Sequence, residues 1–142
     1  MPAAADVQTQ NAGSKAGKAE SGDSITYTFA GTITPSLVLA GWNGSATLVT
    51  VHFQQNAKDD VVTIRNASTG ATLFALGVLD LHGDYSNNAD FTSSVMTASG
   101  NRITVVLGVL SGHMKEKAGP ATMVWTAPTN TVSESGLSDK EF

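Results

Sequence analysis

The amino-acid sequence predicts an all-β protein, built as an antiparallel β-sandwich of about seven or eight strands. Short segments in which apolar and polar residues alternate run through the middle of the chain, and a period of two is typical of half-buried strands. Clusters of Gly, Asn, Asp and Ser separate these segments at intervals of about 8–12 residues, as expected for a sandwich. Apolar residues keep a helical spacing for no more than about two turns anywhere in the chain.

Seven segments carry the strand pattern, and in the first of them Ile25, Tyr27 and Phe29 alternate with Ser and Thr. In chain order, strands are expected at 24–29, 49–53, 62–65, 72–81, 91–97, 103–109 and 122–126. Turns are expected at 42–44, 56–59, 66–70, 86–88 and 99–101, because Gly and Asn tolerate positive φ and Asn or Asp side chains cap their own turns. The segments 66–70 and 98–101 are predicted to close hairpins, and 35–41 to hold one helical turn.

Aromatic side chains in these segments are the expected anchors of the core. An indole combines a large apolar surface with one N–H that needs a partner, so both tryptophans suit the middle or the rim of a sandwich core. Glycines on either side of the first tryptophan indicate a tight turn or a close backbone approach there. The expected core anchors are Trp42, Trp125, Tyr27, Phe29 and Phe53.

Both ends of the chain differ in composition from its middle. Residues 1–22 are poor in large apolar side chains and rich in Ala, Gly, Ser, Gln and Lys, and residues 128–142 are similar. Such segments bury too little surface to offset the entropy lost on ordering. The sequence therefore predicts a flexible N-terminal arm at 1–22, one sandwich domain at 23–127 and a C-terminal tail at 128–142.

Composition and charge exclude several classes of function. The 142 residues contain no cysteine, which removes disulfides, thiol nucleophiles and Cys-ligated metals, and only 14% are charged. A formal net charge of −4 argues against nucleic-acid binding, which needs a clustered basic face. No apolar run is long enough to cross a bilayer. The N-terminus lacks the basic and apolar regions of an export signal, which predicts use without Sec export, unless such a signal has been trimmed away.

One stretch is a candidate cation site. In Asp80-Leu81-His82-Gly83-Asp84, the residues Asp80, His82 and Asp84 hold alternate positions and would present oxygen or imidazole ligands on one side of an extended turn. An EF-type loop would need more acids and a Glu at a fixed offset. The alternative is a polar loop in which Asp forms turns, and Asp59-Asp60 is likewise expected to be a solvated hairpin tip.

No catalytic set emerges from the remaining polar residues. His52 is expected to point outward from its strand and His113 to lie in a loop. The chain contains no Gly-x-Ser-x-Gly elbow and no Gly-rich phosphate loop. The sequence predicts a protein that is not an enzyme and uses no cofactor; an enzyme would need His82 with Asp80 or Asp84 in a concave pocket.

Several stretches together resemble a bacterial Ig-like module found in actinobacterial surface proteins and in virion proteins of the phages that infect those bacteria. The module opens with G-D-x-I-x-[FY]-x-[FY], then a Pro-containing turn, then L-x-G-W-x-G. The matching stretches are 22–29 (GDSITYTF), 34–36 (TPS), 39–46 (LAGWNGSA), 92–96 (TSSVM), 103–108 (ITVVLG) and 121–126 (ATMVWT). The surface proteins continue with a D-x-A-G-N-like motif, whereas this chain continues with Ala127-Pro128-Thr129, which favours the virion form.

This resemblance implies an Ig-like sandwich and a structural role in a virion. The expected function is that of a capsid decoration or cement protein, which binds the capsid surface through its arms and a sandwich edge. Its expected partners are the major capsid protein or other virion subunits, and further copies of itself in a homo-oligomer. Binding to nucleic acid or to a membrane is not expected. It would be made in the host cytoplasm and reside in the virion. The alternatives are an extracellular, cell-surface or carbohydrate-binding module, whose exposed aromatic rings would stack on sugars, and a phage tail protein.

Overall fold

The computed structural model describes the chain apart from residues 13–16, 57–58, 116–121 and 135–141. The described residues form ten strands and two 3-10 helices, so the all-β prediction is confirmed. In chain order these elements are β1 (Ala4–Gln10), β2 (Ser24–Phe29), η1 (Pro35–Leu37), β3 (Thr47–Gln54), β4 (Val61–Asn66), η2 (Phe74–Leu76), β5 (Val78–Asp80), β6 (Ser86–Ser99), β7 (Arg102–Val106), β8 (Val109–Met114), β9 (Met123–Thr126) and β10 (Thr131–Glu134).

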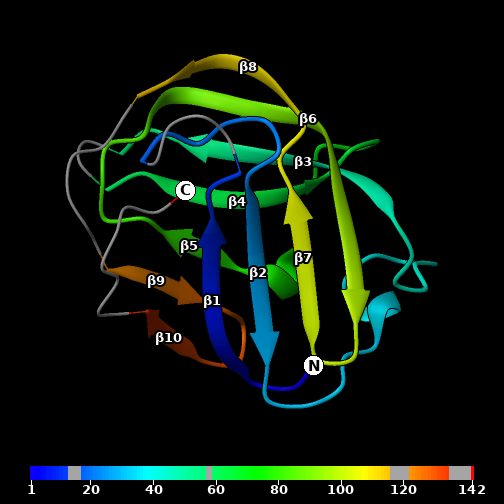
Figure 1. The fold of residues 1–142 in the computed structure, drawn as a ribbon. Coiled ribbons are helices and arrows are strands. Elements are labelled where there is room, and N and C mark those ends of the chain that lie inside the picture. The colour runs from blue at the N-terminus through cyan, green and yellow to red at the C-terminus, as the bar shows by residue number, and fades with distance from the viewer. Residues whose placement is uncertain (13–16, 57–58, 116–121, 135–141) are drawn as a thin grey trace.

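All ten strands belong to one antiparallel sheet, in the order β1-β2-β7-β6-β3-β4-β5-β9-β10, with β8 paired to β6 beside this path. The sheet curls until β1 lies near β10, which gives a nearly closed barrel (Figure 1). Asn130 bridges the remaining gap. Its Nδ2 donates to the Ala4 carbonyl at 2.9 Å, and its Oδ1 accepts from the Ala4 amide at 2.7 Å. One side chain thus supplies two bonds that a strand pair would otherwise make.

The N-terminal segment differs from the expected flexible arm, because residues 4–10 form an edge strand of the sheet. β1 pairs with β2 from Ala4 to Gln10, and the side chain of Val7 in β1 is fully buried. Asp23 holds the following segment: its buried carboxylate accepts hydrogen bonds from the amides of Ala12 at 2.8 Å and Glu20 at 2.9 Å. Composition alone indicated too little apolar surface, but backbone pairing and a buried acceptor supply the missing interactions.

The C-terminal tail also contributes to the domain. β10 pairs with β9, and the side chain of Phe142 is buried, 1% exposed. The Phe142 ring contacts those of Phe53 and Tyr85, with centroids 5.7 and 6.1 Å apart. The remainder of the predicted tail, residues 135–141, lies outside the described residues.

Three expected elements differ from the sequence prediction. The strand expected at 72–81 is divided into η2 and β5, and the turn expected at 86–88 opens the long strand β6. The strand expected at 103–109 is divided at Gly108 into β7 and β8. A Cβ on Gly108 would lie 2.2 Å from the Thr92 carbonyl oxygen, so a close backbone approach separates the two strands. The hairpin at 98–101 is confirmed by the β6–β7 pairing, and η1 provides the helical turn expected in 35–41.

All five expected core anchors are buried. Trp125 lies in an aromatic cluster, its ring edge-on to those of Tyr27 and Phe29 at centroid distances of 4.9 and 5.2 Å. Its indole N–H donates to the Leu76 carbonyl at 2.7 Å. Trp42 is 7% exposed and donates its indole N–H to the Ser45 carbonyl at 2.6 Å. Both indoles therefore have the polar partner that burial requires.

Candidate functional site

The structure brings together two of the three predicted cation ligands, Asp80 and His82, and adds Asp59. Their ligand atoms all lie within 4.8 Å of one another. The His82 ring also donates Nδ1–H to the Thr122 carbonyl at 2.7 Å, which leaves Nε2 as its acceptor. These three groups are fewer than the 6–8 oxygens that Ca²⁺ takes or the four ligands of structural Zn²⁺. The cluster can contribute ligands but does not by itself complete a coordination shell.

Asp59 joins this cluster through strand register. Val61 of β4 faces Asp80 of β5. In an antiparallel pair each step back along one strand is a step forward along the other, so the same register brings Asp59 beside His82. The hydrogen bond from the Leu81 amide to the Asp60 carbonyl, at 2.9 Å, continues this pairing past the end of β5.

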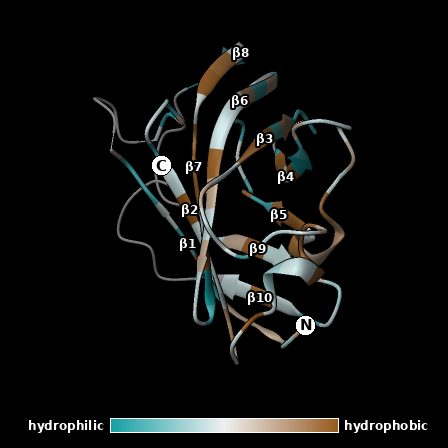
Figure 2. Cartoon of the chain, turned by 90° about the vertical axis from the view of Figure 1, so that its right-hand side faces the viewer, coloured by the Kyte–Doolittle hydropathy of each residue, from teal (hydrophilic) through white to brown (hydrophobic). Residues whose placement is uncertain are grey.

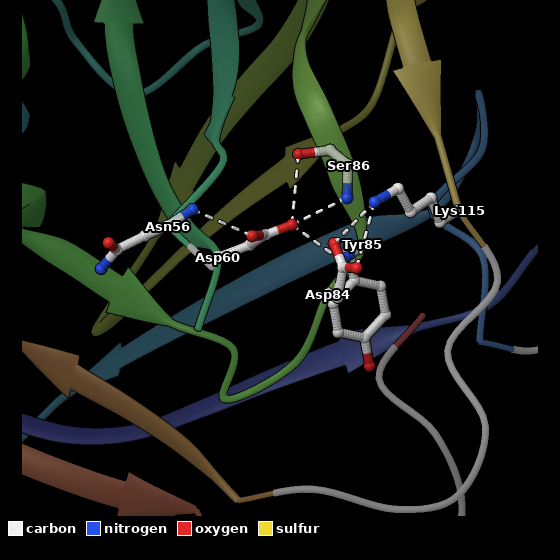
Figure 3. A network of polar contacts seen from close by, with 6 residues as sticks. All are labelled: Asn56, Asp60, Asp84, Tyr85, Ser86 and Lys115. Carbon is white, nitrogen blue, oxygen red and sulfur yellow. Dashed lines mark hydrogen bonds and ion pairs between the residues drawn. The ribbon is translucent and has the colours of Figure 1, made fainter. Parts of the chain in front are cut away.

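Asp84, the third predicted ligand, does not join that cluster. Its carboxylate forms an ion pair with Lys115, whose Nζ lies 3.0 Å from Oδ2 (Figure 3). Both side chains are more than a third exposed, at 40% and 37%. The predicted placement of Asp80, His82 and Asp84 on one side of an extended turn therefore fails at Asp84. Its ion pair with Lys115 instead links the start of β6 to the end of β8.

Asp60, which was expected in a solvated tip, is fully buried. Its Oδ2 accepts from the amides of Tyr85 at 2.8 Å and Ser86 at 2.7 Å, and from the Ser86 hydroxyl at 3.3 Å. Its Oδ1 accepts from the Asn56 amide at 3.2 Å (Figure 3). These bonds tie the β3–β4 connection to the start of β6, so Asp60 has a structural explanation. The expectation of a solvated Asp60 was wrong.

His52 is also engaged by neighbouring side chains. Its Nδ1 lies 2.6 Å from Asp90 Oδ1, across the β3–β6 pair, and its Nε2 lies 3.1 Å from Gln54 Oε1. Neither ring nitrogen is left to act as a base or ligand in this arrangement. The described residues around His52 and His82 therefore provide no assembled nucleophile–base pair.

A hollow with an apolar lining opens at one end of the barrel and has a volume of about 360 Å³. Residues from the N-terminal segment, from η1 and η2, and from the β9–β10 connection line it. The lining includes Met1, Pro2, Leu37, Phe74, Ala127 and Pro128. A second hollow of about 250 Å³ shares Phe74, Ala127 and Pro128, so Phe74 stands between the two. We call the surface formed by both hollows the end surface.

Phe74 is the most exposed large apolar side chain among the described residues, at 79%. Its neighbours on both sides are buried: Leu73 is 6% exposed and Ala75 is 8% exposed. Gly77, at φ 58°, packs so closely on β9 that an added Cβ would lie 2.0 Å from the Thr126 carbonyl oxygen. The turn η2 is therefore fixed to the core on both sides while it holds the Phe74 ring in solvent.

A second apolar surface lies on the outside of the sheet. Leu48 of β3 faces Val95 of β6, and Val95 faces Val106 of β7, so these three side chains form a row across neighbouring strands. Leu48 is 56% exposed and Val106 38%. β8 begins after Leu107 and Gly108 with Val109, which is 62% exposed and pairs with Thr92 of β6, and Figure 2 shows a hydrophobic stretch in β8. We call the row Leu48, Val95 and Val106 the outer apolar face.

Sequence reasoning missed both surfaces. Phe74 lay in a predicted strand, where an aromatic residue is normally assigned to the core. The available signal was Gly77, because a glycine inside a strand pattern often marks a bend or a close backbone approach. Its meaning, however, depends on the contact of Gly77 with β9. Neither tryptophan is exposed, so the aromatic sugar platform that the carbohydrate-binding alternative requires is absent at Trp42 and Trp125.

Comparison of the chain with protein-family models, with curated proteins and with solved structures gives no match. Among the described residues, no helix has the length and apolar character to span a membrane.

Proposed function

We propose that this protein is a non-catalytic structural subunit, a decoration or cement protein of a phage capsid. The observation that carries the proposal is the presence of two separate apolar surfaces on one small domain, the end surface and the outer apolar face. A monomer normally leaves apolar side chains scattered singly, whereas grouped ones mark places where another protein binds. A subunit that joins neighbours in an assembly needs at least two such places.

The chemistry of these surfaces favours protein over ion or substrate. The residues that line the two hollows carry no charged side chain, and their one charged group is the Met1 α-amino group. The outer apolar face is purely aliphatic. A low charge density gives little electrostatic steering of small ions, but it removes the cost of stripping water from charges when two proteins meet. The low content of charged residues, 14%, extends this character to the whole chain.

We assign the capsid contact to the outer apolar face. Its side chains form a row across neighbouring strands on the outside of the sheet, which suits docking on another flat surface better than enclosing a ligand. Residues 4–10 pair within the sheet, so this part of the N-terminal segment is not available as a free clasp. The Ig-like character implied by the motifs belongs to the same proposal: the ten-stranded sheet would be an elaborated Ig-like sandwich, extended at its edges by β1 and β10.

Capsid binding tests this proposal. Purified full-length protein is mixed with actinophage capsids and, separately, with purified tails, and the bound protein is measured after sedimentation. We expect saturable binding to capsids at a fixed stoichiometry. Leu48→Asp should weaken it at least about tenfold, because a buried Leu contributes about 1.5–3 kcal/mol and 1.4 kcal/mol is a factor of ten.

The matched control is Ser68→Asp, which adds the same charge at an exposed turn beyond β4. It should bind capsids like the unmodified protein. Binding to tails alone would transfer the function to the tail, and binding to neither would refute the virion proposal.

A further inference from the structure

We propose that two copies of this chain pair through their end surfaces about a twofold axis, with Phe74 of each copy seated in the hollow of about 360 Å³ on the other. This inference rests on the proposed structural function, because it names the partner of one of the two surfaces. The partner is a second copy of the chain rather than a ligand or another protein.

The end surface carries both parts of a reciprocal contact. The Phe74 ring projects into solvent at 79% exposure, and the hollow opens beside it. An apolar cavity of about 150 Å³ accommodates a benzene ring, so a hollow of about 360 Å³ has room for a phenyl side chain. The hollow has an apolar lining formed by residues such as Pro2, Leu37 and Pro128, which matches that ring chemically.

Reciprocity follows from the position of the ring next to the hollow. In a twofold contact the same patch on each copy faces its equivalent. The Phe74 ring of the first copy then faces the hollow of the second copy, and the Phe74 ring of the second copy faces the hollow of the first. Both rings are then buried by one operation, and the contact closes with two copies. A head-to-tail arrangement would leave one ring and one hollow free and would continue as a filament.

Electrostatic repulsion between two copies is weaker at this surface than elsewhere. The protein has a formal net charge of −4, so two copies repel each other over most of their area. The lining residues of the end surface include no acidic side chain, so the carboxylates that give the chain its negative charge do not meet there. The one charged group among these residues is the Met1 α-amino group.

Hydrogen bonds also fix the backbone of the turn that carries the ring. The Trp125 indole fixes the Leu76 carbonyl at 2.7 Å, and the Gly77 amide donates to the Phe74 carbonyl at 3.1 Å. An aromatic anchor on a fixed turn loses little conformational freedom on binding, which is the property of residues that dominate an interface.

Oligomeric state tests the inference. Sedimentation velocity of the full chain, from micromolar to about 1 mM, should show a concentration-dependent dimer. Phe74→Asp should weaken dimerisation at least about a hundredfold, because each dimer buries two such rings. Since Phe74 is exposed, this substitution leaves the core intact, and an unchanged unfolding midpoint confirms that. Leu48→Asp, on the outer apolar face, should dimerise normally.

A second measurement locates the contact. The chain has no cysteine, so Thr129→Cys and Ser68→Cys each give one site for a spin label. Thr129 borders the hollow, and its labels should give one short distance between copies, whereas those at Ser68 should be far apart.

Three results would overturn the pairing: a monomer at every concentration, a dimer unaffected by Phe74→Asp, or a short distance at Ser68 only. Capsid binding that still depends on Leu48 in a monomeric protein would leave the proposed function standing without the pair. A dimer that binds no capsid would leave the pairing standing and refute the proposed capsid function.

Discussion

Asp60 provides the sharpest test of how the loops at one end of the barrel are held. We consider its replacement by Ala, which removes both carboxylate oxygens from a fully buried position. The amides of Tyr85 and Ser86 then lose their acceptor, and both residues are themselves 0% exposed. A buried donor left without a partner costs about 1–3 kcal/mol, so two of them cost about 2–6 kcal/mol.

This loss is large beside the stability of an ordinary domain, about 5–15 kcal/mol. Asp60→Asn should be milder, at about 1–2 kcal/mol, because its amide oxygen can replace Oδ2 and keep the bonds from the two buried amides. The NH₂ group then faces the Asn56 amide, which lies at an exposed residue where water can serve as acceptor.

Urea denaturation followed by tryptophan fluorescence measures these differences as free energies of unfolding. Asp84→Ala is the matched control, because Asp84 is a neighbouring acid whose ion pair with Lys115 is partly exposed. Such pairs contribute about 0–1 kcal/mol. The reasoning fails if Asp60→Ala loses less than about 1 kcal/mol, or if Asp84→Ala loses as much as Asp60→Ala.

Two further predictions concern the core and the barrel closure. Burial raises the pKa of Tyr27 far above its usual value near 10, so above that pH the unfolded chain releases a proton that the folded chain keeps. Stability should therefore fall by up to about 1.4 kcal/mol per pH unit above about pH 10, and urea titrations of Tyr27→Phe should show a smaller fall. Asn130→Ala should lose about 1–3 kcal/mol, because both hydrogen bonds to the Ala4 backbone are removed. Amide exchange across β1 should then quicken, with the exposed neighbour Thr131→Ala as control; unchanged exchange would mean that Asn130 does not close the barrel.

The strands that could be predicted are those whose own side chains carry the signal. Ile25, Tyr27 and Phe29 point to one face of β2, and their alternation reflects burial by the rest of the sheet. β1 carries no such signal, because Val7 is its only large apolar residue. Its stability comes from pairing with β2 and from Asn130, which is far away in sequence. Contacts of that kind are properties of the folded chain and leave no local pattern.

The candidate site was predictable to a smaller extent. Asp80 and His82 do lie together, but Asp59 enters only through the register of β4 and β5. Asp59 and Asp60 are adjacent in sequence and have opposite environments, one exposed and one fully buried. Residue type and turn composition are the same for both. Only the position of the Tyr85 and Ser86 amides distinguishes them, and those amides belong to another part of the chain.

The two apolar surfaces support each other's role in the proposed assembly. They share no residue, so a copy can use both at once. Joining two copies through their end surfaces would present two outer apolar faces on one rigid unit. When one face binds, the second is held near the capsid at an effective concentration of about millimolar, and overall binding strengthens by about 10²–10⁴ without any new contact. A row as narrow as Leu48, Val95 and Val106 would bind weakly in a single copy. The pair makes such a small contact sufficient, provided that capsid sites are spaced to match.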